Sequence, residues 1–239
     1  KPSFSVNVGN GLWNCKACGK RGNAYQFAVL MGYSNPHQYI NDNSSNGYIK
    51  PIPIKKATPV TYNLDEKLKE FKTNLYNNMD KWNDEVWDTE FIEKYGIGLD
   101  RGNWVFVYQD NNNKIICLKT HKGAQLGNGS TKWYLGHKIA KYSTDKPLYI
   151  CEGEPDTLCL SSMQYQTLSV STGCQSRPTP EMLEQIKRFK VIICYDNDEA
   201  GKKGADKLAE EIHRVNTNPI KIIQWNKDLP DKYDVFDSY

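Results

Sequence analysis

Four acidic residues follow two short apolar runs in the sequence, and their types and spacing suit a divalent metal ion. The apolar runs cover residues 148–151 and 191–195. The acids that follow them are Glu152, Asp156, Asp196 and Asp198. Acids at close quarters repel one another, and burying them without compensation is costly. Mg²⁺ prefers one or two carboxylates together with water and phosphate oxygens. The pattern therefore predicts a divalent-cation site.

The elements that must position these acids are two buried strands. Each apolar run has the length and composition of a strand inside a parallel sheet. Open α/β sheets bind ligands in the crevice at the carboxyl ends of their strands, where these acids would lie. The interval between Glu152 and Asp196 leaves room for a helix, a strand and a second helix. Asp196 and Asp198 alternate on an extended segment, so both can point to the same side.

The alternative interpretation is that these acids are helix N-caps and solvated loop residues, as most aspartates after strands are. A lone acid would favour that interpretation. The combination of E-G-x-x-D at 152–156 with D-x-D at 196–198 favours metal binding instead.

These two motifs resemble the TOPRIM domain that bacterial and phage primases, topoisomerases and some nucleases share. The resemblance covers about residues 147–239 and includes both motifs. It implies that Glu152, Asp196 and Asp198 are catalytic and hold Mg²⁺ or Mn²⁺. Asp156 would be a further ligand of the same ions or a supporting acid.

Near the amino terminus, Cys15 and Cys18 form a C-x-x-C-G knuckle that suits Zn²⁺. Gly19 permits the tight turn between the two thiolates. Zinc needs four ligands, and this knuckle supplies two. An isolated pair could also be a redox dithiol, although the βαβ context of such motifs is missing.

The segment around this knuckle closely resembles the second half of the zinc ribbon of bacterial and phage primases. In that family a first pair of ligands directly precedes the Pro-Ser-Phe strand, which here begins at Pro2. We therefore expect half of the zinc ligands to lie before Lys1. Cys117 and His121 are an alternative source of ligands, although they are far from ribbon spacing.

The composition favours a soluble, ordered chain. Of its 239 residues, 38% are hydrophobic and 12% aromatic, and the mean hydropathy is −0.70. No long apolar run or signal-peptide pattern occurs in the sequence. Seven cysteines, an odd number, indicate thiols and metal ligands instead of a disulfide framework. We therefore expect a cytoplasmic protein, in the host's cytoplasm if a phage or plasmid encodes it. The net charge of +3 requires any basic surface to be local.

Between the two motif-bearing ends lie a linker and a mixed segment. Residues 41–61 have the composition of a linker. Residues 62–146 contain a helical pattern capped by Asn63 and a hairpin pattern over 104–119. This segment resembles the amino-terminal half of a primase catalytic core, in which a sheet carries basic residues beside the metal crevice. The resemblance would place three lysines on nucleic acid or nucleotide: Lys119, Lys132 and Lys138. For each, a solvated lysine at a strand edge is the alternative.

The order of these parts predicts an α/β chain that is α+β overall. A partial zinc ribbon over 1–40 and the linker over 41–61 would precede a basic α+β subdomain over 62–146. A TOPRIM domain, a Rossmann-like parallel sheet flanked by helices, would cover 147–239. The order resembles a DNA primase, most like the phage or plasmid primase-helicase branch. It implies metal-dependent synthesis of short RNA primers from nucleoside triphosphates on single-stranded DNA, with a replicative helicase as partner, fused or in trans.

Two other functions stay open on the sequence. A TOPRIM nuclease needs only metal ions and a lysine, and a catalytically silent module would simply bind single-stranded DNA. A topoisomerase would need a separate tyrosine-bearing domain, for which the chain has no room. The ribbon favours the primase, since TOPRIM nucleases do not usually carry one. The sequence contains no G-x-x-x-x-G-K-[ST] motif, so we expect no nucleotide-driven motor in it.

Overall fold

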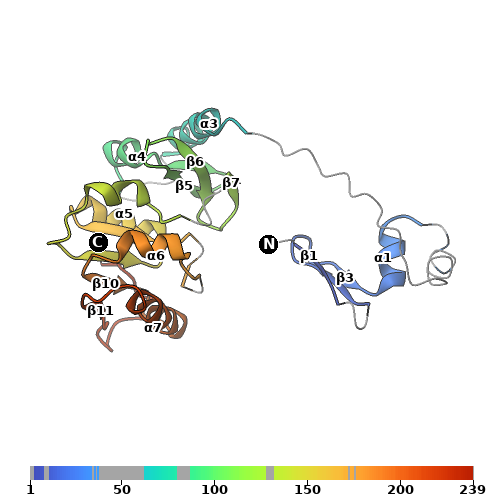
Figure 1. The fold of residues 1–239 in the computed structure, drawn as a ribbon. Helices are drawn as coiled ribbons and strands as arrows, with labels where there is room; N and C mark the ends of the chain where they lie inside the picture. Colours follow the sequence, from blue (N-terminus) through green and yellow to red (C-terminus); the bar gives the residue numbers. More distant parts are fainter. Residues whose placement is uncertain are drawn as a thin grey trace. The chain divides into compact units, whose positions relative to one another are not determined.

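The structure is a computed structural model that divides into two compact units, Lys1–Val60 and Thr61–Tyr239 (Figure 1). It describes residues 3–7, 11–33, 35, 37, 62–79, 87–127, 132–171, 173–174 and 176–238. The linker predicted over 41–61 falls outside the described residues.

The first unit is a small antiparallel sheet with one helix. Its strands, in sheet order, are β1 (Phe4–Val6), β2 (Trp13–Cys15) and β3 (Arg21–Gly22), and the helix is α1 (Ala24–Leu30). Asn23 and Gln26 form a reciprocal capping box that fixes the start of the helix. Trp13 is buried between the rings of Phe4 and Phe27, with ring centroids 5.6 and 5.4 Å away. This aromatic cluster is the core of the unit.

The carboxyl-terminal part of the second unit is built on a four-stranded parallel sheet in the order β11-β10-β8-β9 (Figure 1). The strands are β8 (Leu148–Cys151), β9 (Gln166–Ser169), β10 (Val191–Cys194) and β11 (Ile220–Ile222). The helices are α5 (Glu154–Ser162), α6 (Pro180–Ile186) and α7 (Glu199–His213). The predicted helix, strand and second helix between Glu152 and Asp196 are thus α5, β9 and α6.

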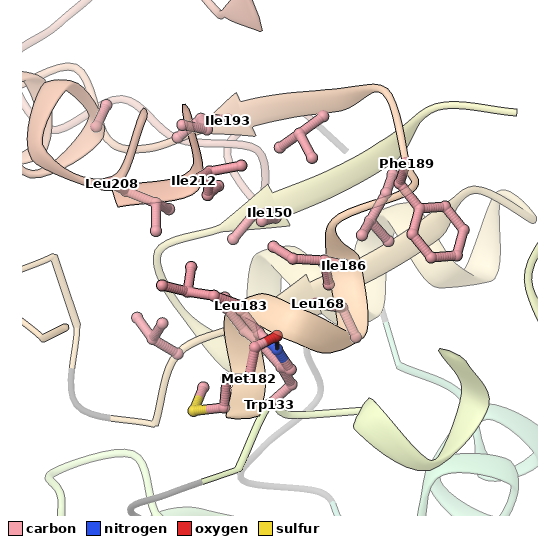
Figure 2. Close-up of a cluster of buried hydrophobic side chains, with 14 of the residues drawn as sticks. Trp133, Ile150, Leu168, Met182, Leu183, Ile186, Phe189, Ile193, Leu208 and Ile212 are labelled. Carbon is pink, nitrogen blue, oxygen red and sulfur yellow. Dashed lines mark hydrogen bonds between the residues drawn. The ribbon is translucent and has the colours of Figure 1, made fainter. Parts of the chain in front are cut away.

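Side chains of the central strands alternate between the two faces of this sheet. Ile150 and Ile193 lie in the larger core with residues of α6 and α7 (Figure 2). Their neighbours Cys151 and Cys194 face the other way and pack against Cys159 of α5. Helices therefore cover both faces, which is why the strands read as continuous apolar runs instead of alternating ones.

The amino-terminal part of the second unit is an antiparallel sheet in the order β4-β5-β6-β7. Its strands are β4 (Gly98–Asp100), β5 (Asn103–Gln109), β6 (Ile115–Thr120) and β7 (Gln125–Gly127); the helices are α3 (Leu64–Tyr76), α4 (Thr89–Tyr95) and the 3₁₀ helix η2 (Gly136–Lys141). Val105 and Val107 pack with Phe71 of α3. Phe106 lies in a cluster with residues of α4 and with Leu158 of α5. Helix α5 thus contributes to the cores of both sheets.

The predicted fold class, a parallel sheet flanked by helices and preceded by a mixed α+β part, is confirmed. Helix α5 begins at Glu154, because Gly153 is its N-cap and Pro155 lies in its first turn. The sequence did not predict β4, β7 or η2. Within the described residues, no helix is both long and apolar enough to cross a membrane.

Candidate active site

The acids behind β8 and β10 converge because these strands pair in parallel with Cys151 opposite Cys194. Glu152 and Asp196 therefore leave the sheet at the same edge. They line one cavity of about 700 Å³ together with Asp156 and Asp234. One carboxylate oxygen from each of Asp156, Asp196 and Asp234 lies within 4.8 Å of the others. The predicted convergence of Glu152, Asp156 and Asp196 on one crevice is what the structure shows.

This crowding disfavours the ionised forms of the acids. Burial, with the charges of Asp234 and Asp196, raises the pKa of Asp156 to about 8. Burial, with the charges of Glu152 and Asp234, raises the pKa of Asp196 to about 7. Burial also raises the pKa of Asp234. Such a cluster is relieved by a cation that the carboxylates can share.

Glu152 gives an independent sign of a missing partner. Its oxygen Oε2 is buried and has no hydrogen-bond partner among the described residues. The Cys174 thiol lies beside this carboxylate; burial and then the neighbouring Glu152 carboxylate raise the pKa of Cys174 to about 12. An unsatisfied buried carboxylate oxygen beside three clustered acids fits a site for a divalent cation.

Asp198 does two things in the structure. Its Oδ1 accepts the backbone N–H of Gly201 at 2.6 Å, so it is the N-cap of α7. Its charge also helps to raise the pKa of Asp196. A Cβ on Gly201 would lie 2.4 Å from the Asp196 carbonyl oxygen, so the first turn of α7 needs glycine there. Asp198 is outside the group of three acids, and its predicted metal role stays a prediction.

Asp234 is the site residue that the sequence interpretation missed. The tail that carries it is tied to the site, since the backbone N–H of Phe236 donates to Asp156 Oδ1 at 3.0 Å. The N–H of Asn197 also donates to the carbonyl of Tyr233 at 2.8 Å. The available signal was the resemblance to TOPRIM domains over about residues 147–239, which includes the tail.

Lys119 is buried in an ion pair instead of lying at a strand edge in solvent. Its Nζ is 2.5 Å from Glu154 Oε1, and the two side chains are only 7% and 4% exposed. Tyr108 donates to the same oxygen at 2.6 Å. The pair joins β6 to the first turn of α5. In the sequence, Glu154 lies between the two cavity acids Glu152 and Asp156. Lys119 also lines the acid cavity, so its predicted contact with nucleotide stays a prediction.

The other two lysines lie elsewhere. Lys132 is exposed, and Lys138 is partly buried with its Nζ 4.8 Å from the centroid of the Tyr95 ring. Neither is among the described residues that line the acid cavity. The cation that the sequence interpretation overlooked is Lys122, which lies exposed beside His121 in the β6–β7 turn and lines the cavity.

In the first unit, the structure forms the expected knuckle. The N–H of Gly19 donates to the carbonyl of Cys15 at 2.8 Å, and Gly19 has φ of +70°. Hydrogen bonds from Cys18 and Ala17 lower the pKa of the Cys15 thiol, which favours the thiolate that zinc needs. Cys117 is fully buried in a core of the second unit.

Comparisons with known proteins agree with this geometry. Residues 149–234 match the family model described as Toprim-like. The Aquifex aeolicus primase structure, comprising zinc-binding and RNA polymerase domains, superposes with a TM-score of 0.58 at 16% identity; the match covers 99% of this chain and 72% of that one. A DNA primase domain from Pseudomonas aeruginosa gives 0.57 at 14% identity, over 73% and 72% of the two chains. The catalytic domain of DnaG primase bound to single-stranded DNA gives 0.54 at 16% identity, over 72% and 71%. No curated protein sequence matches the chain.

Proposed function

We propose that this chain, whose carboxyl-terminal part is a TOPRIM domain within the fold of a primase catalytic core, is a DNA primase. It would make short RNA primers on single-stranded DNA from nucleoside triphosphates. The observation that carries the proposal is the cavity in which acids from β8, β10 and the tail meet beside the basic side chains of the antiparallel sheet. The proposed domains are 1–40, 62–146 and 147–239, with a linker over 41–61 between the first two.

The chain's own residues divide the work of nucleotidyl transfer. Glu152, Asp156, Asp196 and Asp234 would hold divalent cations, with Asp198 as a further acid at the same edge. Bound there, Mg²⁺ or Mn²⁺ supplies positive charge that favours attack by the primer 3′-hydroxyl and stabilises an in-line displacement. In that displacement the hydroxyl would give its proton to a base, its oxygen would bond the α-phosphorus, and the bond from that phosphorus to the departing pyrophosphate would break. The unpartnered Oε2 of Glu152 is available to accept a hydrogen bond from the attacking hydroxyl.

Basic residues at the cavity would neutralise phosphate. Lys122 is exposed at its rim, and Lys119 lines its wall while bound to Glu154. Phosphate contacts of this kind bind any sequence. A template of single-stranded DNA agrees with the DnaG structure named above. Further parts of the proposal are zinc at Cys15 and Cys18, a replicative helicase as partner, and the cytoplasm as the compartment.

One incubation separates this function from its rivals. The protein is mixed with single-stranded DNA, the four ribonucleoside triphosphates and Mg²⁺, and the products are resolved by size. New oligoribonucleotides that depend on template and metal are the expected result. Cut DNA would indicate a TOPRIM nuclease. Intact DNA with no new product, despite template binding, would indicate a silent binding module, and either result would overturn the proposal.

A further inference from the structure

The cavity that holds the acids has a second wall made of rings. We define the aromatic wall as Trp104, His121 and Phe236, which all line the cavity. Trp104 and Phe236 are partly buried and His121 is exposed. The acids come from the parallel sheet and the tail, whereas two of the three rings come from the antiparallel sheet and the turn after it. The cavity therefore has a charged side and an aromatic side.

The aromatic wall packs on a buried indole, Trp87, which also lines the cavity. Trp87, which is 4% exposed, meets Trp104 edge-on at 4.9 Å and 69°, and meets Phe236 at 5.7 Å and 80° between ring planes. Trp87 itself stacks on Phe91 of α4 at 5.7 Å and 8°. Such edge-to-face pairs fix ring orientation as well as burying area.

Backbone hydrogen bonds tie the same wall to its surroundings and to the acids. The N–H of His121 donates to the carbonyl of Trp104 at 2.8 Å. The N–H of Phe236 donates to Asp156 Oδ1. The aromatic wall therefore keeps a fixed position relative to the acid cluster, as a preformed binding site requires.

A nucleotide has a charged part and an aromatic part, which match the charged side and the aromatic side of the cavity. Its phosphates carry charge that shared cations and Lys122 would neutralise, and its base is planar and has a π-face. Stacking of a base on an aromatic side chain stabilises binding and tolerates any base. The cavity of about 700 Å³ is of the size that holds small-molecule ligands. Trp104 and Phe236 bring large aromatic surface to the cavity lining, which is the surface that a planar base can stack on.

We propose that the aromatic wall is the nucleobase subsite for the nucleotide whose phosphates lie on the acids. The identity of this ligand rests on the proposed function. Because stacking accepts every base, the subsite holds all four nucleotides and leaves selection to pairing with a template. Trp104 is the residue expected to contribute most, since its indole has the largest face of the three rings.

The test is a matched pair of substitutions, Trp104→Leu and Trp104→Phe, in the whole protein. Leucine keeps apolar bulk and loses the π-face, whereas phenylalanine keeps a face. Binding of ATP, CTP, GTP and UTP is measured calorimetrically with Mg²⁺ and without template. Inorganic triphosphate, which lacks a base, is the reference ligand. We expect Trp104→Leu to weaken all four nucleotides about tenfold, Trp104→Phe to weaken them by less than about threefold, and inorganic triphosphate to bind all three proteins alike.

Because Trp104 also packs on Trp87, a second substitution guards against damage to the fold. His121→Ala lies in an exposed turn, and we expect it to weaken the nucleotides about threefold at an unchanged melting temperature. Unchanged nucleotide affinity in both Trp104→Leu and His121→Ala would overturn the subsite. An equal loss of affinity for inorganic triphosphate would also overturn the subsite. A loss of affinity confined to single-stranded DNA would overturn it too, because the aromatic wall would then bind the template.

The outcome is distinguishable from that of the proposed function. If the protein makes no primers but Trp104→Leu lowers its affinity for nucleotides, the subsite is supported and the primase function is overturned. If the protein makes primers and Trp104→Leu leaves its affinity for nucleotides unchanged, the primase function is supported and the subsite is overturned.

Discussion

Asp196 is the single residue on which the acid site depends most, because it lies next to Glu152, Asp156 and Asp234. Asp196→Asn keeps the side-chain volume and removes one charge from a crowded cluster. We expect primer synthesis to fall roughly a thousandfold, since losing about 4 kcal/mol of transition-state stabilisation has that effect. The metal-free protein should melt at the same temperature or higher, because repulsion among the acids is relieved. Synthesis is measured against Mg²⁺ concentration, and melting with and without the metal.

The matched control for Asp196→Asn is Asp145→Asn, an exposed acid away from the cavity. It should change neither synthesis nor melting. Near-normal primer synthesis by Asp196→Asn would remove that acid from the metal site.

The raised pKa values of Asp156 and Asp196 predict how stability depends on pH. They are about 8 and about 7 in the folded protein, whereas an unfolded aspartate titrates near about 3.9. Between those values the folded metal-free protein keeps protons that the unfolded chain has released. The contribution of these acids is therefore fully present below about pH 4 and is lost as pH rises through 7 to 8.

We thus expect the melting temperature of the metal-free protein to fall between about pH 5 and pH 8, and Mg²⁺ to raise it most at pH 8. Calorimetry across that range measures both effects. The double variant Asp156→Asn/Asp196→Asn should show a flatter profile. A wild-type profile that rises with pH would contradict the assigned shifts.

At the scale of single residues, the sequence predicts the acids that follow strands and misses the acid that the carboxyl-terminal tail brings to the site. Glu152, Asp156 and Asp196 were predictable because buried strands and their ends leave a local pattern. Asp234 follows no strand, and its place depends on the tail returning to Asp156. The ion pair of Lys119 was not predicted, because its partner Glu154 lies in another element.

At the scale of elements, the start of α7 tests the two roles of Asp198. Asp198→Ala removes both the cap and the charge, whereas Asp198→Asn keeps a good capping side chain. We expect Ala to lower the free energy of unfolding by about 1 kcal/mol and Asn to leave it nearly unchanged. If Asp198 also serves the metal site, both variants should lose primer synthesis. Urea unfolding and primer assays measure the two effects; full activity in Asp198→Asn would leave Asp198 as a cap only.

The link between β6 and α5 gives the strongest stability prediction. Lys119→Met strands the buried carboxylate of Glu154, and we expect the free energy of unfolding to drop by about 3–5 kcal/mol. Adding Glu154→Gln removes that stranded charge while Tyr108 keeps an acceptor, so the double variant should be more stable than Lys119→Met alone. Both are measured by urea unfolding.

The exposed Lys132→Ala is the matched control and should stay within about 0.5 kcal/mol of wild type. If Lys119→Met is equally harmless, the ion pair contributes little, and Lys119 is free to act as the phosphate contact that the sequence predicted.

Element prediction succeeded where the chain signals its own boundaries. The helix predicted behind Asn63 is α3, which begins at Leu64 because the Asn63 side chain caps it by accepting from the backbone N–H of Glu66. The short strands β4 and β7 were missed because three residues carry no period, and each exists only through pairing with a longer neighbour. Tertiary pairing of this kind leaves no local signal.

At the scale of the whole molecule, the second unit combines two sheets around one cavity. Helix α5 connects them, since Leu158 packs in the core of the antiparallel sheet and Cys159 packs beneath the parallel one. The acids and the aromatic wall therefore depend on one helix for their relative placement. Sequence analysis could predict each sheet from its strand pattern. The shared helix could not be predicted, because its two-sided burial depends on both sheets being in place.

The division into two units predicts that zinc and catalysis respond separately to mutation. The four hydrophobic clusters of the second unit are built from described residues between Leu64 and Phe236. Cys15→Ser with Cys18→Ser in the full-length protein should remove bound zinc and unfold the ribbon, since a structural zinc site contributes its binding energy to folding. The unfolding transition of the second unit and its affinity for nucleotides should stay as in wild type, while primer initiation on template falls.

Metal analysis, calorimetry and primer assays measure these effects. Cys174→Ser, a thiol outside the ribbon, is the control that should keep zinc. Unchanged zinc in the double variant would remove Cys15 and Cys18 from the zinc site, and a lowered transition of the second unit would show that its stability depends on the ribbon.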